Sequence, residues 1–86
     1  GYVYVGSNDG KVYQLNASNI TQEIGHYTTG GLVTSSPAVA NGYVYVGSND
    51  GKVYQLNASN ISQVITSYSI GTAVYRTSPA LVGSVV

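Results

Sequence analysis

The stretch GYVYVGSNDGKVYQLN fills residues 1–16 and recurs unchanged at residues 42–57, an offset of 41 residues. The next eight residues of each copy match except at two positions, Thr21/Ser62 and Glu23/Val64. A repeat at a period of this length is typical of a chain built from copies of one small structural unit. The sequence therefore predicts two copies of a unit and the beginning of a third, divided as residues 1–34, 35–76 and 77–86.

Each unit is predicted to form four short β-strands joined by tight turns. The strand segments are rich in Val and Tyr, and along the first half of the chain they are residues 2–5, 11–15, about 22–28 and 36–40. An Asn-Asp-Gly turn between apolar runs is a strong hairpin signal, because glycine adopts a positive φ without steric cost. These hairpin residues are Asn8, Asp9 and Gly10, with their copies Asn49, Asp50 and Gly51. No window shows the period of an amphipathic helix, so we expect an all-β chain.

Both faces of the predicted strands are apolar, as in Tyr2-Val3-Tyr4-Val5. A sheet with one face in water would instead alternate apolar and polar residues. Small antiparallel sheets are covered on both sides when they stack around an axis, and a period of about 40–50 residues with four strands is typical of a β-propeller blade. A β-solenoid is the competing interpretation, but its coils are usually shorter, and Asp-Gly hairpins favour antiparallel meanders.

The repeated segments YVYVGSNDGKVYQLNAS and SSPAVANG resemble the repeat of the PQQ-like, or quinoprotein-type, β-propeller family. The resemblance covers essentially the whole chain and implies that the SPAVA strand lies nearest the propeller axis. The chain departs from the family at the blade-docking Trp, where Ile24 and Ile65 stand, and at the DAxTG turn, which here is Asn16-Ala17-Ser18-Asn19-Ile20. Quinone-dependent members also need a Ca²⁺ site, a catalytic Asp and a cation over the cofactor. This sequence supplies no such set, so the resemblance implies the fold and no catalytic, cofactor-binding or metal-binding residue.

The chain begins at the second strand of a blade, so it is expected to hold three strands, then one complete four-stranded blade, then the first strand of another. Two blades cannot close around an axis, and we therefore expect their outer faces and edge strands to meet further copies or further blades of a parent chain. A heterologous contact of this kind closes into a ring or propagates as a filament. The tyrosines expected to pack between blades are Tyr2, Tyr4, Tyr13, Tyr43, Tyr45 and Tyr54. The alternative role for this aromatic surface is carbohydrate binding by stacking.

Four asparagines lie in patterns that accept N-linked glycans, namely Asn16, Asn19, Asn57 and Asn60. Asn also forms turns without any glycan, and turn formation alone explains its presence here. Four such patterns in a low-charge chain without cysteine favour an extracellular or cell-surface location.

The composition excludes several classes of function. Only 7% of the residues are charged and the net charge is zero, which argues against a nucleic-acid binder. No apolar run approaches the roughly 18–20 residues of a membrane span. Asp9 and Asp50 do not match a calcium-binding loop and are expected to serve their turns. His26 has no matching partner in the second unit, where Ser67 stands, and no Ser or Cys is placed to act as its nucleophile.

These observations predict a non-enzymatic, structural propeller module of an extracellular or cell-surface protein, which assembles with itself and uses no cofactor. The alternative is a ligand-binding segment, for a glycan or a protein, of a longer surface protein. Part of a quinoprotein-type enzyme is a third interpretation, which the missing site residues disfavour.

Overall fold

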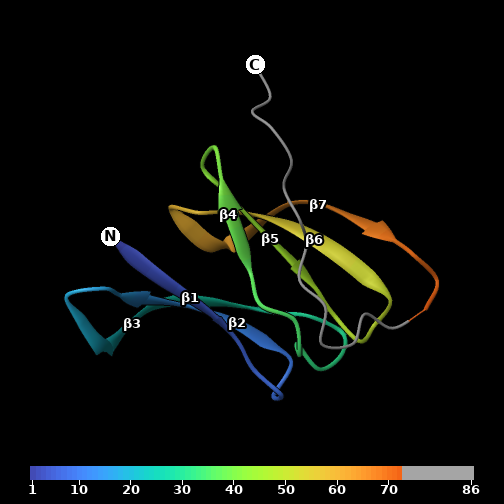
Figure 1. Cartoon of the computed structure of the whole chain (residues 1–86), viewed down its shortest axis with the longest axis horizontal. Helices are drawn as coiled ribbons and strands as arrows, with labels where there is room; N and C mark the ends of the chain where they lie inside the picture. The colour runs from blue at the N-terminus through green and yellow to red at the C-terminus, as the bar shows by residue number, and fades with distance from the viewer. Residues whose placement is uncertain (73–86) are drawn as a thin grey trace.

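The computed structural model describes residues 1–72, which form seven β-strands and no helix. The strands are β1 (Tyr2–Gly6), β2 (Lys11–Asn16), β3 (Asn19–Thr28), β4 (Ala38–Ala40), β5 (Tyr43–Gly47), β6 (Lys52–Asn57) and β7 (Asn60–Ser69). They make two antiparallel sheets with the strand orders β1-β2-β3 and β4-β5-β6-β7 (Figure 1). The expected all-β class, with three strands followed by four, is confirmed over these residues. The strand expected at 78–82 and the end of the second unit at 73–76 lie outside the described residues.

The glycines of the two Asn-Asp-Gly turns have the positive φ that a tight hairpin requires. Gly10 has φ 87° and Gly51 has φ 86°. In the first turn the Ser7 N–H donates to the Lys11 carbonyl at 2.9 Å, and the Asp9 carboxylate accepts the Lys11 N–H at 3.0 Å. The same bonds recur 41 residues later, so both hairpins have one geometry.

The third strand of each sheet begins earlier than the sequence predicts. β3 starts at Asn19 rather than near residue 22, because a two-residue turn reverses the chain directly. The Asn16 side chain holds this turn by accepting the Ser18 N–H at 2.9 Å. Ile24 is an extra residue in the pairing with β2, and a β-bulge absorbs it so that the strand continues beyond it.

The strand before the Asn41-Gly42 turn is shorter than the sequence predicts. It begins at Ala38 rather than Ser36, because Pro37 has no N–H to offer to the neighbouring strand. Asn41 and Gly42 both have positive φ, at 52° and 82°, which suits a two-residue hairpin turn. This turn returns the chain to β5.

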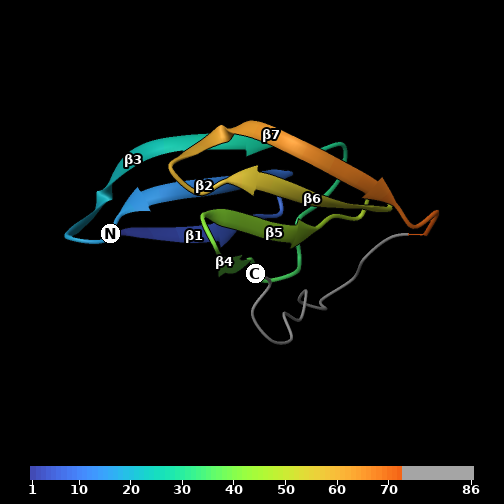
Figure 2. The ribbon, with the colours of Figure 1, turned by 90° about the horizontal axis from the view of Figure 1, so that it is seen from above.

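The two sheets stack face to face, and Figure 2 shows β1-β2-β3 running alongside β5-β6-β7 in the same order. The core between them consists of Val12, Val33, Val44, Val46, Tyr54, Leu56 and Ile61. Within residues 1–72 each sheet has one sheet neighbour, and large apolar side chains remain exposed on both. The described residues therefore present one buried contact between the sheets and one open face on each sheet.

Candidate functional site

Gln14 on β2 is the polar centre of the contact between the sheets, with 1% of its surface exposed. Its Nε2 donates to the Ala58 carbonyl at 3.0 Å, and its Oε1 accepts the Ile61 N–H at 3.2 Å. The Tyr4 hydroxyl donates to the same Ala58 carbonyl. A buried amide needs partners at both ends, and here both ends bind the turn region between β6 and β7. The first sheet therefore holds the second in one register.

Apolar side chains surround this amide. The fully buried ones from the second sheet are Val44, Val46, Leu56 and Ile61. The rings of Tyr27 and Tyr54 meet across the contact with their centroids 5.6 Å apart and their planes inclined by 56°. Burying an aliphatic side chain of this size stabilises a fold by roughly 1.5–3 kcal/mol, and tilted aromatic pairs add to that. Within residues 1–72 the contact holds the hydrophobic core and is therefore a main source of stability.

The loop after β3 closes one end of the contact. The Gly30 N–H donates to the Asp50 carboxylate at 3.0 Å, and the Tyr54 hydroxyl donates to the same carboxylate. Burial alone would raise the pKa of Asp50, but these hydrogen bonds outweigh it and hold the pKa below its ordinary value. Burial, together with the bond to Asp50, raises the pKa of Tyr54. A Cβ on Gly31 would lie 2.7 Å from the Asp50 backbone nitrogen, so the loop approaches the turn as closely as a glycine allows.

The contact joins two unlike faces of the same repeated unit. In the first unit, the face that carries Tyr4 and Gln14 covers the second sheet, and we name it the head face. In the second unit, the face that carries Val44 and Val46 covers the first sheet, and we name it the tail face. Because side chains alternate along a strand, each unit turns its other face outward. The free head face thus belongs to the second unit and the free tail face to the first.

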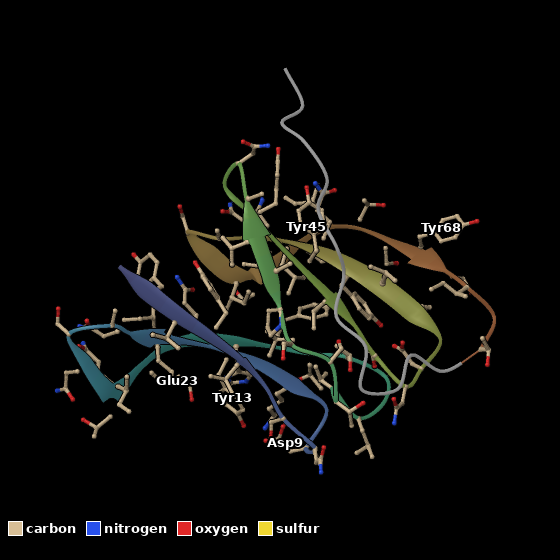
Figure 3. All side chains as sticks on the ribbon, viewed as in Figure 1. Asp9, Tyr13, Glu23, Tyr45 and Tyr68 are labelled. Carbon is tan, nitrogen blue, oxygen red and sulfur yellow. The ribbon has the colours of Figure 1, made fainter. Side chains whose placement is uncertain are left out.

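The free faces repeat most residues of the covered ones. They differ at three positions in the third strand: Thr66 replaces Gly25 on the free head face, and Glu23 and His26 stand on the free tail face where the second unit has Val64 and Ser67. The covered head face holds Tyr4, Val12, Gln14 and Tyr27, and the free head face holds Tyr45, Val53, Gln55 and Tyr68. The covered tail face holds Val44, Val46, Tyr54, Leu56 and Ile61, and the free tail face holds Val3, Val5, Tyr13, Leu15 and Ile20. Figure 3 shows the labelled Tyr45 and Tyr68 on one side of the molecule and Tyr13 on the other.

Exposure separates the free residues from their buried copies. Val5 is 41% exposed and Ile20 is 63% exposed, whereas Val46 and Ile61 are 0% exposed. Tyr68 on the free head face is 73% exposed. This face also has a hollow of about 300 Å³, whose lining includes Tyr45, Val53, Gln55, Thr66 and Tyr68. Within residues 1–72 the two outer surfaces are therefore largely apolar and uncovered, although most of their sequence is that of a buried contact.

The structure distributes the six expected packing tyrosines unevenly. Tyr4 and Tyr54 lie in the contact between the sheets. The other four lie on the outer faces or margins of the described sheets, namely Tyr2, Tyr13, Tyr43 and Tyr45. Two of the six expected tyrosines therefore pack between the two sheets within residues 1–72.

Sequence analysis missed Gln14 and Tyr27 as contact residues. Gln14 had a usable signal, because it is a lone amide inside an apolar strand whose two faces were both expected to be covered. Such an amide must find partners in the layer that covers it. Tyr27 had no signal beyond its place in a less regular strand.

The four asparagines of the glycan-acceptor patterns lie at the turns between β2 and β3 and between β6 and β7. Their side chains make local bonds there. The Asn16 Nδ2 donates to the Gln22 side chain at 2.7 Å, and Asn57 does the same with Gln63. The structure thus shows a turn role for these residues, and their glycosylation stays a prediction.

The side chains of Asp9, Glu23 and His26 make short-range contacts. The Asp9 carboxylate accepts the Lys11 N–H and the Tyr13 hydroxyl, so it serves its own hairpin. His26 Nδ1 lies 2.8 Å from Glu23 Oε2 on the exposed surface. In the described part of the chain, no three His, Asp or Glu side chains gather to hold a metal ion. Residues 1–72 also contain no helix of the length and apolarity needed to cross a membrane.

No protein-family model matches the chain, and a search of the curated proteins finds no match. The resemblance to the PQQ-like propeller repeat therefore stays an expectation from the residues. Within residues 1–72 the geometry leaves two unlike sheet faces open, and each repeats most of a face that is covered in the internal contact.

Proposed function

We propose that this chain is a structural β-propeller repeat module without enzymatic activity, which associates with itself through its outer sheet faces and edge strands into a ring or filament. The observation that carries the proposal is the pair of free faces, because they repeat the residues of a contact that the chain buries between its own sheets. Exposed apolar patches in soluble proteins usually mark an interface. A further copy of the same unit is the partner that matches both faces at once.

In this proposal each sheet is one propeller blade. The second sheet has four antiparallel strands, whereas the first has three and no strand beside β1 within the described residues. An unpaired edge strand offers a row of backbone N–H and C=O groups to another chain. We propose that a strand of another copy, or of further blades in a parent chain, pairs with β1 and completes the first blade.

An extracellular or cell-surface location belongs to the same proposal. It is supported by the glycan-acceptor patterns, since Asn19 and Asn60 are exposed at turns where a bulky glycan can be attached. Expression in a glycosylating eukaryotic host, followed by peptide mass spectrometry, tests this part. Unmodified asparagines in the secreted chain would remove its main support.

Mass measurement in solution tests the assembly. Sedimentation velocity over a wide concentration range should give species that are multiples of the single chain and that grow with concentration. Negative-stain electron microscopy of the largest species should show rings or fibres. A chain that stays a single copy at every concentration would contradict the proposal.

The hollow on the free head face favours one second candidate, which is carbohydrate binding. Tyr45 and Tyr68 border this hollow, and aromatic rings with a polar hydroxyl suit stacking against a sugar. Titration of neutral oligosaccharides, followed by tyrosine fluorescence, tests it with Tyr68→Ala as the matched control. Saturable binding by a single-copy chain that Tyr68→Ala abolishes would favour this candidate over assembly.

A further inference from the structure

We infer that copies of the chain associate head to tail, with the free head face of one copy covering the free tail face of the next. The inference rests on the proposed function and adds the surfaces, their direction and the partner, which is a second copy of this chain. Its template is the contact between the chain's own two sheets, where a head face already covers a tail face. A heterologous contact of this kind is repeated by every further copy.

Gln55 fixes the register of the contact between copies. It occupies the position of Gln14 one repeat later, but among residues 1–72 its Nε2 donates to the Tyr45 hydroxyl on its own face, at 3.3 Å, and to no other group. In the assembled pair this amide binds the Ala17 carbonyl and the Ile20 N–H of the next copy. Those two backbone groups are the copies of the ones that Gln14 binds within the chain.

Apolar side chains of the next copy fill the hollow on the free head face. Ile20 is the copy of Ile61, whose Cγ2 lies 3.4 Å from the place where a Cβ on Gly25 would stand. The hollow has Thr66 at the position of Gly25, and 3.4 Å is an ordinary contact distance for a Cβ. The Thr66 Cβ therefore leaves room for the isoleucine, and the threonine rotamer in the assembled pair turns Oγ1 and Cγ2 away from it. Tyr13 of the next copy meets Tyr68 as Tyr54 meets Tyr27 inside the chain.

Polar groups exclude the two symmetric arrangements. In a contact between two head faces, the two Gln55 side chains would face each other. The β2–β3 turns, whose backbone groups Gln55 would bind, would then lie outside the contact. In a contact between two tail faces, the Ala17 carbonyl and the Ile20 N–H would lose water without gaining an amide. Only the head-to-tail arrangement gives every one of these groups the partner that its copy has in the internal contact.

The loop that closes the internal contact is not repeated between copies. Thr29 and Gly31 are replaced 41 residues later by Ile70 and Thr72. The Thr29 Oγ1 lies 2.9 Å from the Ser48 Oγ, a bond that isoleucine cannot make. There is no room for a side chain between Gly31 and the β5–β6 turn, whereas Thr72 at the corresponding position has a side chain. The contact between copies therefore rests on the sheet faces and the β2–β3 turn, and it is weaker than the internal one.

Two charge variants test the direction of assembly. Tyr68→Lys blocks the head face and Ile20→Lys blocks the tail face, and both side chains are exposed enough for the single chain to keep its fold. Each variant alone is expected to sediment as a single copy. An equimolar mixture should form a one-to-one complex and nothing larger, because each variant supplies the face that the other lacks. Ser59→Lys is the matched control, at an exposed turn on neither free face, and it should assemble like the unmodified chain.

Sedimentation velocity and native mass spectrometry separate the outcomes, with far-UV circular dichroism as the check of folding. Gln55→Lys and Val5→Lys form a second head and tail pair that must behave in the same way. If the unmodified chain assembles but one variant alone still assembles, or the mixture stays as single copies, the head-to-tail inference is wrong and self-assembly stands. If the unmodified chain is a single copy at every concentration, the proposed function itself fails.

Discussion

At the scale of single residues, Asp50 ties the β5–β6 turn to the neighbouring repeat. Its carboxylate accepts the N–H groups of Lys52 and Gly30, each at 3.0 Å, and the Tyr54 hydroxyl. Its copy Asp9 makes the same bonds within its own hairpin, but within residues 1–72 it accepts no N–H from another unit. A comparison of the two carboxylates therefore separates the turn bonds from the bond between repeats.

The free energy of unfolding is expected to fall in acid through Asp50. Burial raises its pKa, but the bonds from Tyr54, Gly30 and Lys52 outweigh burial and keep the pKa below 3.8. A lowered pKa in the folded state stabilises the fold above the unfolded-state pKa, and this stabilisation is lost as the pH falls through the folded-state value. Urea unfolding midpoints should therefore drop below about pH 4, and Asp50→Asn should flatten this drop.

Asp9→Asn is the control for that titration. The hydrogen bond from Tyr13 is the first cause of the lowered pKa of Asp9, and that bond stays inside one exposed hairpin. We expect Asp9→Asn to flatten the acid dependence less than Asp50→Asn does. Equal flattening by the two variants would show that the Gly30 bond between repeats contributes nothing.

Gly31→Ala is expected to destabilise the chain by about 1–3 kcal/mol, the usual effect of over-packing. The new Cβ would lie 2.7 Å from the Asp50 nitrogen and 3.0 Å from the Asn49 carbonyl carbon, and these backbone atoms have no rotamer to change. Gly25→Ala is the control, because its nearest neighbour would be a methyl group at 3.4 Å. Chemical unfolding of both variants measures the difference, and similar losses would mean that crowding is not the cause.

At the scale of elements, β2 and β6 show one sequence in two environments. Both strands read KVYQLN. In β2 the glutamine is buried and the leucine is half-exposed, whereas in β6 Gln55 is half-exposed and Leu56 is fully buried. The strand sequence therefore allows either face to be covered, and the place of the strand in the stack decides which face is.

Substitutions of Gln14 and Gln55 test whether the place of a strand in the stack decides the role of its glutamine. Gln14→Ala should cost about 1–3 kcal/mol, because it leaves the Ala58 carbonyl and the Ile61 N–H buried with one partner fewer. Gln55→Ala should change the stability of the single chain by less than about 0.5 kcal/mol, as surface substitutions do, and should weaken association instead. Urea unfolding of dilute protein and sedimentation of concentrated protein measure the two effects. Equal losses of single-chain stability would contradict the assigned roles.

Local signals explain which elements the sequence predicts. The hairpins follow from Asn-Asp-Gly, because the positive φ of Gly10 depends on residues within the turn alone. The strand ends are less predictable. β3 starts three residues early through a bond from the Asn16 side chain to the turn, and β4 loses two residues to the missing N–H of Pro37. These details belong to turn geometry and not to strand propensity.

The candidate site was predictable in kind but not in position. Apolar residues on both faces of each strand indicated that both faces are covered; within residues 1–72 one face of each sheet is covered by the other sheet, and the cover of the second face stays a prediction. Because the two segments are identical in sequence, they do not predict which face of each copy is covered. That depends on the neighbours of each unit. Gln14 and Gln55 therefore look alike in the sequence, and only the arrangement in space makes one of them a buried anchor and the other a free one.

At the scale of the whole molecule, the association proposed above couples to folding. A chain of 86 residues buries only somewhat more than about 60% of the surface that its unfolded form exposes, a smaller fraction than a larger domain buries, so its own core gives limited stability. The net charge of zero provides little repulsion between copies. A second copy that covers the free head face recognises a surface that exists only in the folded chain. Each docking event therefore stabilises the fold by mass action.

The melting temperature is accordingly expected to rise with protein concentration. A partner that binds only the folded chain stabilises it by about 2.7 kcal/mol at a concentration near 100 times Kd, and each kcal/mol moves the melting temperature of a domain this size by about 4–8 °C. Thermal melts followed by circular dichroism should thus differ by roughly 10–20 °C between dilute and concentrated protein. Tyr68→Lys should melt at one temperature throughout, because it loses the partner and keeps the fold. A fixed melting temperature in an unmodified chain that assembles would mean that copies bind the unfolded chain as strongly as the folded one. That outcome would contradict association through the folded sheet faces.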